Sequence, residues 1–315
     1  LAPYTWDLAR LFTCLFITTH MEHLTQANAL TLCNSFIEMY VQTVMKAHIR
    51  TLEEEEVTGF VKDLRRQVKT RNRKALLDAR TMLTGERRTF RIDGEHHTAV
   101  TETERAEVSA AIEDWARKEP DPGFFKVLDV AHRIAGVGSL GIKRYIVLVE
   151  GKGSPDQNFL LDLKQELPSC LERFLRWPQP RWTNQAERVV SIQQWTQLMP
   201  PALLSTVQLG DMGYVMRELQ PSEDKVQLDR LGAKVERWEE VVQVIAKVVG
   251  WDQLFSGGRH GSTTARPLKQ FVQTMDWRTS LLNYAQYYAA QVEQDYRAFC
   301  SAFDSGSFSS KESSS

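Results

Sequence analysis

The chain has 315 residues, of which 42% are hydrophobic and 25% are charged, and its formal net charge is -1. This is an ordinary globular composition, long enough for two closely packed lobes, and it has no overall field for a nucleic-acid backbone or an anionic membrane. No stretch approaches the roughly 20 apolar residues of a membrane span. We therefore expect a cytoplasmic protein without membrane or nucleic-acid partners. The sequence does not predict an oligomeric state.

Residues 1–119 predict a helical region that contains one short hairpin. Apolar residues recur at helical spacing between Thr5 and Lys46, which indicates two amphipathic helices. The acidic run 53–56 is typical of a helix N-terminus, and the basic residues of 62–74 continue this third helix. Asp93-Gly94 predicts the tight turn of a hairpin, and a short helix closes the region.

The basic stretch 62–74 has two possible interpretations. A charge run of this kind is most often a solvated helix face. It could instead be a functional surface that binds RNA or a phosphate-rich ligand, with binding that depends strongly on salt.

A break at Pro120 to Gly123 marks the boundary of a second region, 120–226. There the composition predicts strand, glycine loop, strand, turn, strand, helix and strand. Helices return in 227–303, and the serine-rich end, 304–315, is expected to be a disordered tail. The predicted fold class is α+β, predominantly helical, with one small antiparallel sheet.

The glycine loop fits the pattern GxGxxG with Gly136, Gly138, Ser139 and Gly141. In a dinucleotide-binding fold these glycines would open a helix, but here β-branched and aromatic residues follow, so the loop joins two strands. A third strand ends on Lys164. This is the order of a protein kinase, in which backbone N–H groups approach the phosphates of ATP and the lysine contacts the α and β phosphates.

Such a lysine needs a carboxylate partner, for which Glu187 on the next helix is the first candidate and Glu166 the alternative. The strand 214–219 would connect two lobes, where Arg217 and Glu218 either meet an adenine ring or form a structural ion pair. The plainer alternative is that the glycine loop is only a tight hairpin and Lys164 a surface residue. We find no catalytic segment of the HRD or DFG type and no metal-site spacing.

A set of ordered segments resembles one bacterial family, domain of unknown function 2252, which is grouped with kinase-like proteins. The segments are PYTWDLARL (3–11), GVGSLGIKRYIVLVEG (136–151), LDLKQ (161–165), ERVVSIQQWTQ (187–197), VMRELQPSEDKV (215–226), SGGRHGSTTARPLKQF (256–271) and NYAQYYAAQVEQDYRAF (283–299). The resemblance implies a protein-kinase-like (aminoglycoside-phosphotransferase-like) fold in circularly permuted order, since catalytic motifs precede the glycine loop in that family.

In that family, GDxHxxNF and NDFDE motifs precede the segment that resembles PYTWDLARL, and both are absent here. We therefore expect an N-terminally truncated member without turnover of its own. The resemblance implies that the intact protein is an ATP-dependent phosphotransferase that uses ATP and Mg on an unknown small-molecule acceptor. The alternative is a pseudo-enzyme module that binds a nucleotide or a protein.

Overall fold

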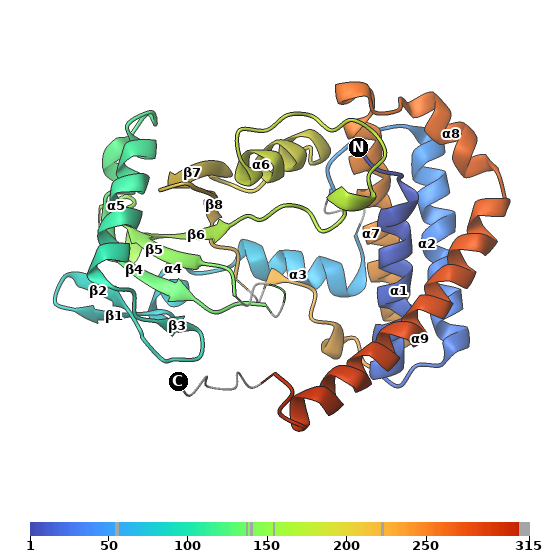
Figure 1. Ribbon diagram of the computed structural model, residues 1–315, viewed down its shortest axis with the longest axis horizontal. Coiled ribbons are helices and arrows are strands. Elements are labelled where there is room, and N and C mark those ends of the chain that lie inside the picture. Colours follow the sequence, from blue (N-terminus) through green and yellow to red (C-terminus); the bar gives the residue numbers. More distant parts are fainter. Residues whose placement is uncertain (54–56, 137, 139–140, 154, 222–223, 309–315) are drawn as a thin grey trace, which may run out of the picture. The chain divides into compact units, whose positions relative to one another are not determined.

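The computed structural model describes residues 1–53, 57–136, 138, 141–153, 155–221 and 224–308. It divides into two compact units (Figure 1). Unit 1 combines Leu1–Lys62 with Gln227–Ser315, and unit 2 is Asp63–Val226. Unit 2 is therefore one continuous stretch of sequence, whereas unit 1 is assembled from the two segments that flank it.

Unit 1 is helical, and the two amphipathic helices expected between Thr5 and Lys46 are confirmed. Thr25 caps the second of them, because its side chain accepts a hydrogen bond from the backbone of Asn28, whose side chain bonds the Thr25 N–H in return. The helices of this unit are α1 (Thr5–Met21), α2 (Gln26–Lys46), the first turn of α3 (Gly59–Lys69), α7 (Val235–Ser256), α8 (Ala265–Gln273) and α9 (Asp276–Asp304).

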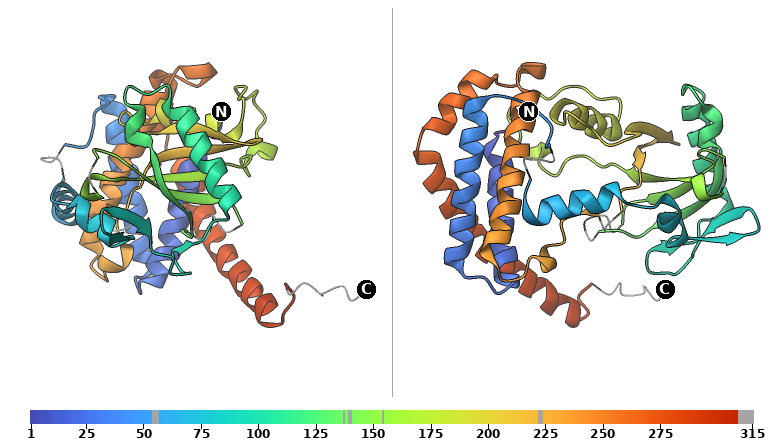
Figure 2. Two further views of the ribbon diagram at one scale, coloured as in Figure 1. Left: turned by 90° about the vertical axis from the view of Figure 1, so that its left-hand side faces the viewer. Right: turned by 180° about the vertical axis from the view of Figure 1, so that it is seen from behind.

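The core of unit 1 lies where α2 packs against α7, with α1 and α9 side by side next to them (Figures 1 and 2). The rings of Phe12 and Phe36 meet edge to face with centroids 5.3 Å apart. A Cβ atom added to Gly250 of α7 would lie 2.9 Å from the Thr43 methyl group of α2. The two helices can therefore approach closely only because position 250 has no side chain.

Unit 2 is built on an antiparallel sheet with the strand order β3-β4-β5-β6-β8-β7 among the described residues, and on a separate hairpin, β1-β2. The sheet is larger than the small one expected. Its strands are β3 (His97–Thr98), β4 (Val127–Arg133), β5 (Arg144–Val149), β6 (Phe159–Gln165), β7 (Ser205–Leu209) and β8 (Met212–Glu218); the hairpin is β1 (Thr81–Thr84) and β2 (Arg87–Phe90).

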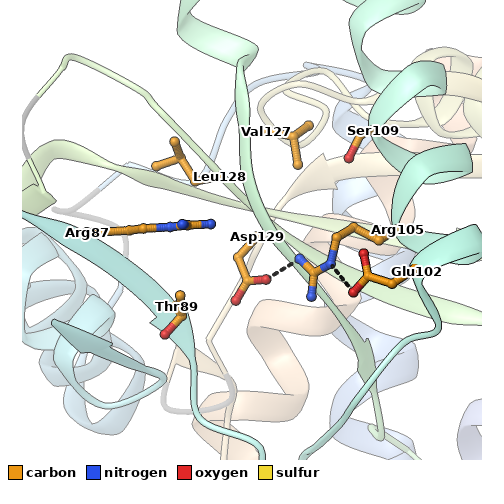
Figure 3. A pocket seen from close by; sticks show the side chains of 8 residues that line it. All are labelled: Arg87, Thr89, Glu102, Arg105, Ser109, Val127, Leu128 and Asp129. Carbon is orange, nitrogen blue, oxygen red and sulfur yellow. Dashed lines mark hydrogen bonds and ion pairs between the residues drawn. The ribbon is translucent and has the colours of Figure 1, made fainter. Parts of the chain in front are cut away.

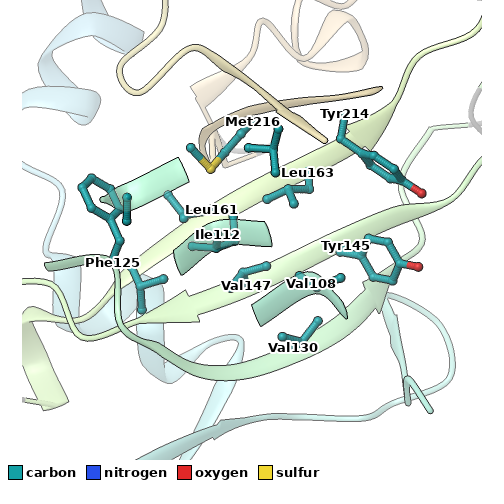
Figure 4. Close-up of a cluster of buried hydrophobic side chains, with 13 residues drawn as sticks. Val108, Ile112, Phe125, Val130, Tyr145, Val147, Leu161, Leu163, Tyr214 and Met216 are labelled. Atoms are coloured by element: carbon teal, nitrogen blue, oxygen red, sulfur yellow. The ribbon is translucent and has the colours of Figure 1, made fainter. Parts of the chain in front are cut away.

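One face of the sheet packs against α5 (Glu102–Ala116) and forms the largest core of unit 2 (Figure 4). We call it the α5 face. Alternate strand residues point to it, because side chains in a strand alternate between faces. Val108 and Ile112 of the helix meet a set of side chains from four strands: Val130, Tyr145, Val147, Leu161, Leu163, Tyr214 and Met216.

The opposite face, which we call the α6 face, is covered in two places. Helix α6 (Gln185–Thr196) packs on Val215 through Ala186 and Val190. Helix α4 (Arg73–Asp78) and the hairpin contribute Leu77 and Phe90, which pack on Ala131, Ile146, Leu148, Leu160 and Leu219. The same face also bears polar side chains on β6 and β8, namely Asp162, Lys164 and Arg217.

Three expectations need correction. The hairpin predicted around Asp93-Gly94 is wrong: β2 pairs with β1, and β3 pairs with β4 instead. Helix α3 begins at Gly59, after the acidic run, of which Glu54 to Glu56 lie outside the described residues. The boundary expected at 120 falls inside unit 2, because α5 packs on the sheet. Only 304–308 of the expected tail are described.

Candidate functional site

The predicted glycine loop is the connection 134–143 between β4 and β5, as the sequence indicated. Gly136 and Gly141 have φ angles of 77° and 80°, a region that other residues rarely adopt. The backbone therefore requires glycine at these two positions. Ser139, also a candidate contact, lies outside the described residues.

Gly138 has no comparable reason within the described part of the chain. It is not among the residues with positive φ, and an added Cβ atom would meet no described atom within 4 Å. Glycine at this position is thus explained neither by backbone strain nor by packing. Close approach of a ligand to the backbone is a third reason for a glycine.

Lys164 lies next to the end of this loop. It is opposite Arg144, the first residue of β5, in the antiparallel register. The backbone of Gln165 donates to the carbonyl of Lys143 over 3.0 Å, and the Lys143 N–H donates to the Gln165 side chain over 3.1 Å. On its other side Lys164 is opposite Val215, so its side chain lies on the α6 face.

Lys164 pairs with Glu166, the alternative partner, through an Nζ to Oε1 distance of 3.3 Å. Glu187 has a different contact in this structure. It lies in the first turn of α6, where its carboxylate accepts a hydrogen bond from the Thr183 N–H. That bond holds the pKa of Glu187 below its ordinary value. Lys164 is about one-third exposed, so its ammonium group remains accessible.

Arg217 and Glu218 pair with different residues rather than with each other. Arg217 Nε lies 3.6 Å from Asp162 Oδ2, and Glu218 Oε1 lies 3.6 Å from an Arg73 guanidinium nitrogen. The Glu218 N–H donates to the Ala202 carbonyl over 3.0 Å. The Glu218 N–H is therefore already paired within the protein.

A cluster centred on Asp162 was missed in the sequence. Asp162 of β6 is 2% exposed and lies on the α6 face, opposite Ile146 and Arg217. Arg144 binds it with two hydrogen bonds of 2.8 and 2.6 Å, and Arg133 lies 2.9 Å from its Oδ1. Burial opposes ionisation, but the hydrogen bonds and charges of these arginines hold the pKa of Asp162 below its ordinary value.

The sequence contains one indication of this cluster. Asp162 interrupts the apolar run Phe159–Leu163, and a charged residue inside such a run must find partners when the strand is buried. What the sequence could not supply was the register that brings arginines from three other strands to the same carboxylate.

A pocket of about 480 Å³ lies where the hairpin and α5 meet β4 (Figure 3). Asp129 lines it, and its carboxylate accepts hydrogen bonds from Arg105 and from the Phe90 N–H. Figure 3 shows Arg105 between Asp129 and Glu102. Asp129 therefore joins the hairpin and α5 to the sheet, and Arg87, Thr89 and Ser109 also line the pocket.

The basic stretch 62–74 is partly neutralised. Arg71 pairs with Asp224, and the Lys74 ammonium lies 3.0 Å from Asp156 and 3.6 Å from Asp78. Arg66 lies 3.7 Å from Asp63. The interpretations as a solvated face and as a binding surface both remain predictions.

Within the described ranges, no group of three or more His, Cys, Asp or Glu side chains is placed to hold a metal ion. Nor does any helix in that part of the chain have the length and apolar character needed to cross a membrane.

An antiparallel sheet with a glycine loop and a neighbouring lysine, joined to a helical unit, defines a mixed α and β protein with a candidate anion site. The family comparison agrees with the segments noted in the sequence: residues 1–302 match the model of uncharacterized proteins conserved in bacteria, domain of unknown function 2252 (DUF2252). The chain belongs to this family. No curated protein and no solved structure matches it.

Proposed function

We propose that unit 2 is the kinase-like small lobe of an ATP-dependent phosphotransferase and binds the phosphates of the nucleotide between the glycine loop and Lys164. The observation that carries this proposal is the position of the lysine. Its strand neighbour, Arg144, begins the strand that follows the glycine loop, so loop and lysine are adjacent although far apart in sequence.

The order of elements supports the same function. The loop joins the first two strands of the antiparallel series β4-β5-β6, the lysine lies on the third, and α6 follows and packs on the face that bears the lysine. Protein kinases place a glycine-rich loop, a strand lysine and a helix in this sequence. For the acceptor we propose only what the family resemblance implies, namely a small molecule.

The residues present fit the phosphates of ATP better than they fit Mg. Gly138 leaves its backbone open to close approach, and Lys164 provides a partly exposed ammonium group. The nearby carboxylates, by contrast, are already bound: Asp162 by arginines and Glu166 by Lys164. We therefore assign nucleotide contacts to this site and assign no magnesium ligand among the described residues.

The test is calorimetric titration of the full chain with Mg-ATP. We expect Lys164→Ala to weaken binding by about tenfold or more, because the variant loses the ammonium group that faces the phosphates. Gly138→Ala should also weaken binding while leaving the unfolding midpoint unchanged or slightly raised, since its Cβ meets no described atom.

The matched control is Lys126→Ala. Lys126 is another lysine of unit 2, and its ammonium group lies 3.7 Å from Glu150. Equal effects of the two lysine variants, or absence of Mg-ATP binding to the wild type, would contradict the nucleotide site. Binding that depends on Lys164 in a full-length family member without phosphotransfer would favour the alternative of a nucleotide-binding pseudo-enzyme.

A further inference from the structure

The Asp162 cluster carries an excess of positive charge. Three guanidinium groups, from Arg133, Arg144 and Arg217, contact one carboxylate. The other nearby acids within the described ranges have partners of their own, since Glu166 binds Lys164 and Glu218 binds Arg73. The loop 134–143 contains no Asp or Glu that could contribute a further negative charge.

This excess is costly because two of the arginines are well buried. The Arg133 and Arg144 side chains are 16% and 11% exposed. Burial lowers the pKa of the Arg133 guanidinium, and the charge of Arg144 lowers it further against the opposing effect of Asp162. An arginine nevertheless stays ionised in proteins, so the like charges remain close together at a free-energy cost.

The hydrogen-bonding capacity of the cluster is also incomplete. Each of the three nitrogen atoms of Arg144 makes one hydrogen bond, two of them to Asp162 and one to the Ala135 carbonyl. Arg133 and Arg217 each contact only Asp162 among the side chains that the structure describes. Each therefore keeps guanidinium N–H donors for a further acceptor, and both groups are held beside the same carboxylate.

We propose that Arg133 and Arg217 form a binding site for a phosphoryl group on the α6 face of the sheet, with Asp162 and Arg144 as positioning residues. A phosphate accepts paired hydrogen bonds from guanidinium groups, and its negative charge would neutralise the excess of the cluster. Asp162 fixes the arginines and offsets only one of their three positive charges. The site goes beyond the proposed nucleotide contacts, because it depends on neither the glycine loop nor Lys164.

The experiment is a titration of the full chain with inorganic phosphate and with pyrophosphate. Arg217→Gln is the informative variant, because this arginine is 33% exposed and its one ion pair with a described residue is the long 3.6 Å contact, so its loss should leave the fold intact. We expect phosphate binding to weaken by about tenfold. Arg217→Lys keeps the charge but loses the planar fork of donors. Its affinity for phosphate should therefore lie between those of the wild type and Arg217→Gln.

Arg117→Gln is the control. Arg117 follows α5, which packs on the opposite face of the sheet, and its guanidinium lies 3.4 Å from Asp114. We expect its effect on phosphate binding to stay within about twofold. A wild type that binds neither anion, or equal effects of the two variants, would overturn the proposal.

Two further arms separate this site from the proposed nucleotide contacts. Lys164→Ala should weaken Mg-ATP binding but leave phosphate binding within about twofold, so that either proposal can fail alone. Phosphate titration at saturating Mg-ATP identifies which ligand supplies the phosphoryl group. Competition would mean that the nucleotide supplies it, whereas undiminished phosphate binding would assign the site to a second phosphorylated ligand.

Discussion

Glu104, in the first turn of α5, connects the helix to the sheet and to the end of the glycine loop. Its carboxylate accepts a hydrogen bond from the Thr101 N–H over 3.1 Å and lies 3.2 Å from His132 Nε2. The Lys143 ammonium and the Tyr145 hydroxyl both donate to its other oxygen over 3.3 Å. Burial opposes ionisation, but the Thr101 N–H and Lys143 outweigh it and lower the pKa of Glu104 to about 2.

This shift predicts how stability depends on pH. Because the pKa is lower in the folded protein, the contribution of Glu104 is complete above its ordinary pKa of 4.5 and is lost as the pH falls toward about 2. Glu104→Gln should lower the free energy of unfolding at neutral pH by about 1–3 kcal/mol. The difference from wild type should shrink on acidification, as measured by urea denaturation.

Glu113→Gln provides the comparison for this measurement, since Glu113 is exposed on the same helix. It should change stability little at any of these pH values. A loss in Glu104→Gln that stayed constant down to pH about 2 would show that the carboxylate charge is not what stabilises the site.

At the scale of elements, the contact between α2 and α7 depends on Gly250. Tyr40 of α2 donates a hydrogen bond to Gln253 of α7, one turn from this glycine. The Thr43 hydroxyl donates to the Met39 carbonyl over 2.8 Å, which fixes the side chain that faces Gly250. A larger residue at position 250 therefore has no space unless the helices move apart.

Gly250→Val should lower the free energy of unfolding by about 1–3 kcal/mol, the usual range for an overpacked core. Thermal and urea unfolding followed by circular dichroism would measure it. Valine has a higher helix propensity than the glycine it replaces, so a loss at position 250 comes from packing, and Arg237→Val, at an exposed position of the same helix, controls for a general effect of valine in α7. Equal losses in the two variants would mean that the helices are not held by close approach at Gly250.

Pairing of elements was also where sequence reasoning was least reliable. The Asp93-Gly94 turn exists, and its carboxylate accepts hydrogen bonds from the backbone N–H groups of His96 and His97 over 2.7 and 2.9 Å. The strand that follows pairs with β4 rather than with the preceding segment. A local turn signal therefore gave the position of the turn but not the identity of the strand partner.

At the scale of the whole molecule, unit 2 is a continuous segment with its own buried clusters. The α5 face and the α6 face are both covered by elements from within residues 63–226. A segment that buries its own apolar side chains has what it needs to fold alone. Unit 1 differs, because α2 and α7 come from opposite ends of the sequence.

We expect a fragment of residues 63–226 to fold independently, with dispersed amide signals in NMR and one cooperative unfolding transition. A fragment of residues 1–62, which contains α2 but lacks α7, should not form a stable core. The prediction fails if the first fragment shows neither dispersed signals nor a transition, because its stability would then depend on unit 1.

The sequence by itself determined most helices, the strand–loop–strand order around Gly136 to Gly141, and the position of Lys164 at the end of a strand. These features follow from local periodicity and backbone preference, which neighbouring residues determine. Only the tertiary structure decided that Lys164 contacts Glu166, that β3 pairs with β4, and that three arginines share Asp162. Such contacts depend on strand register and on the packing of elements far apart in sequence, which no local pattern specifies.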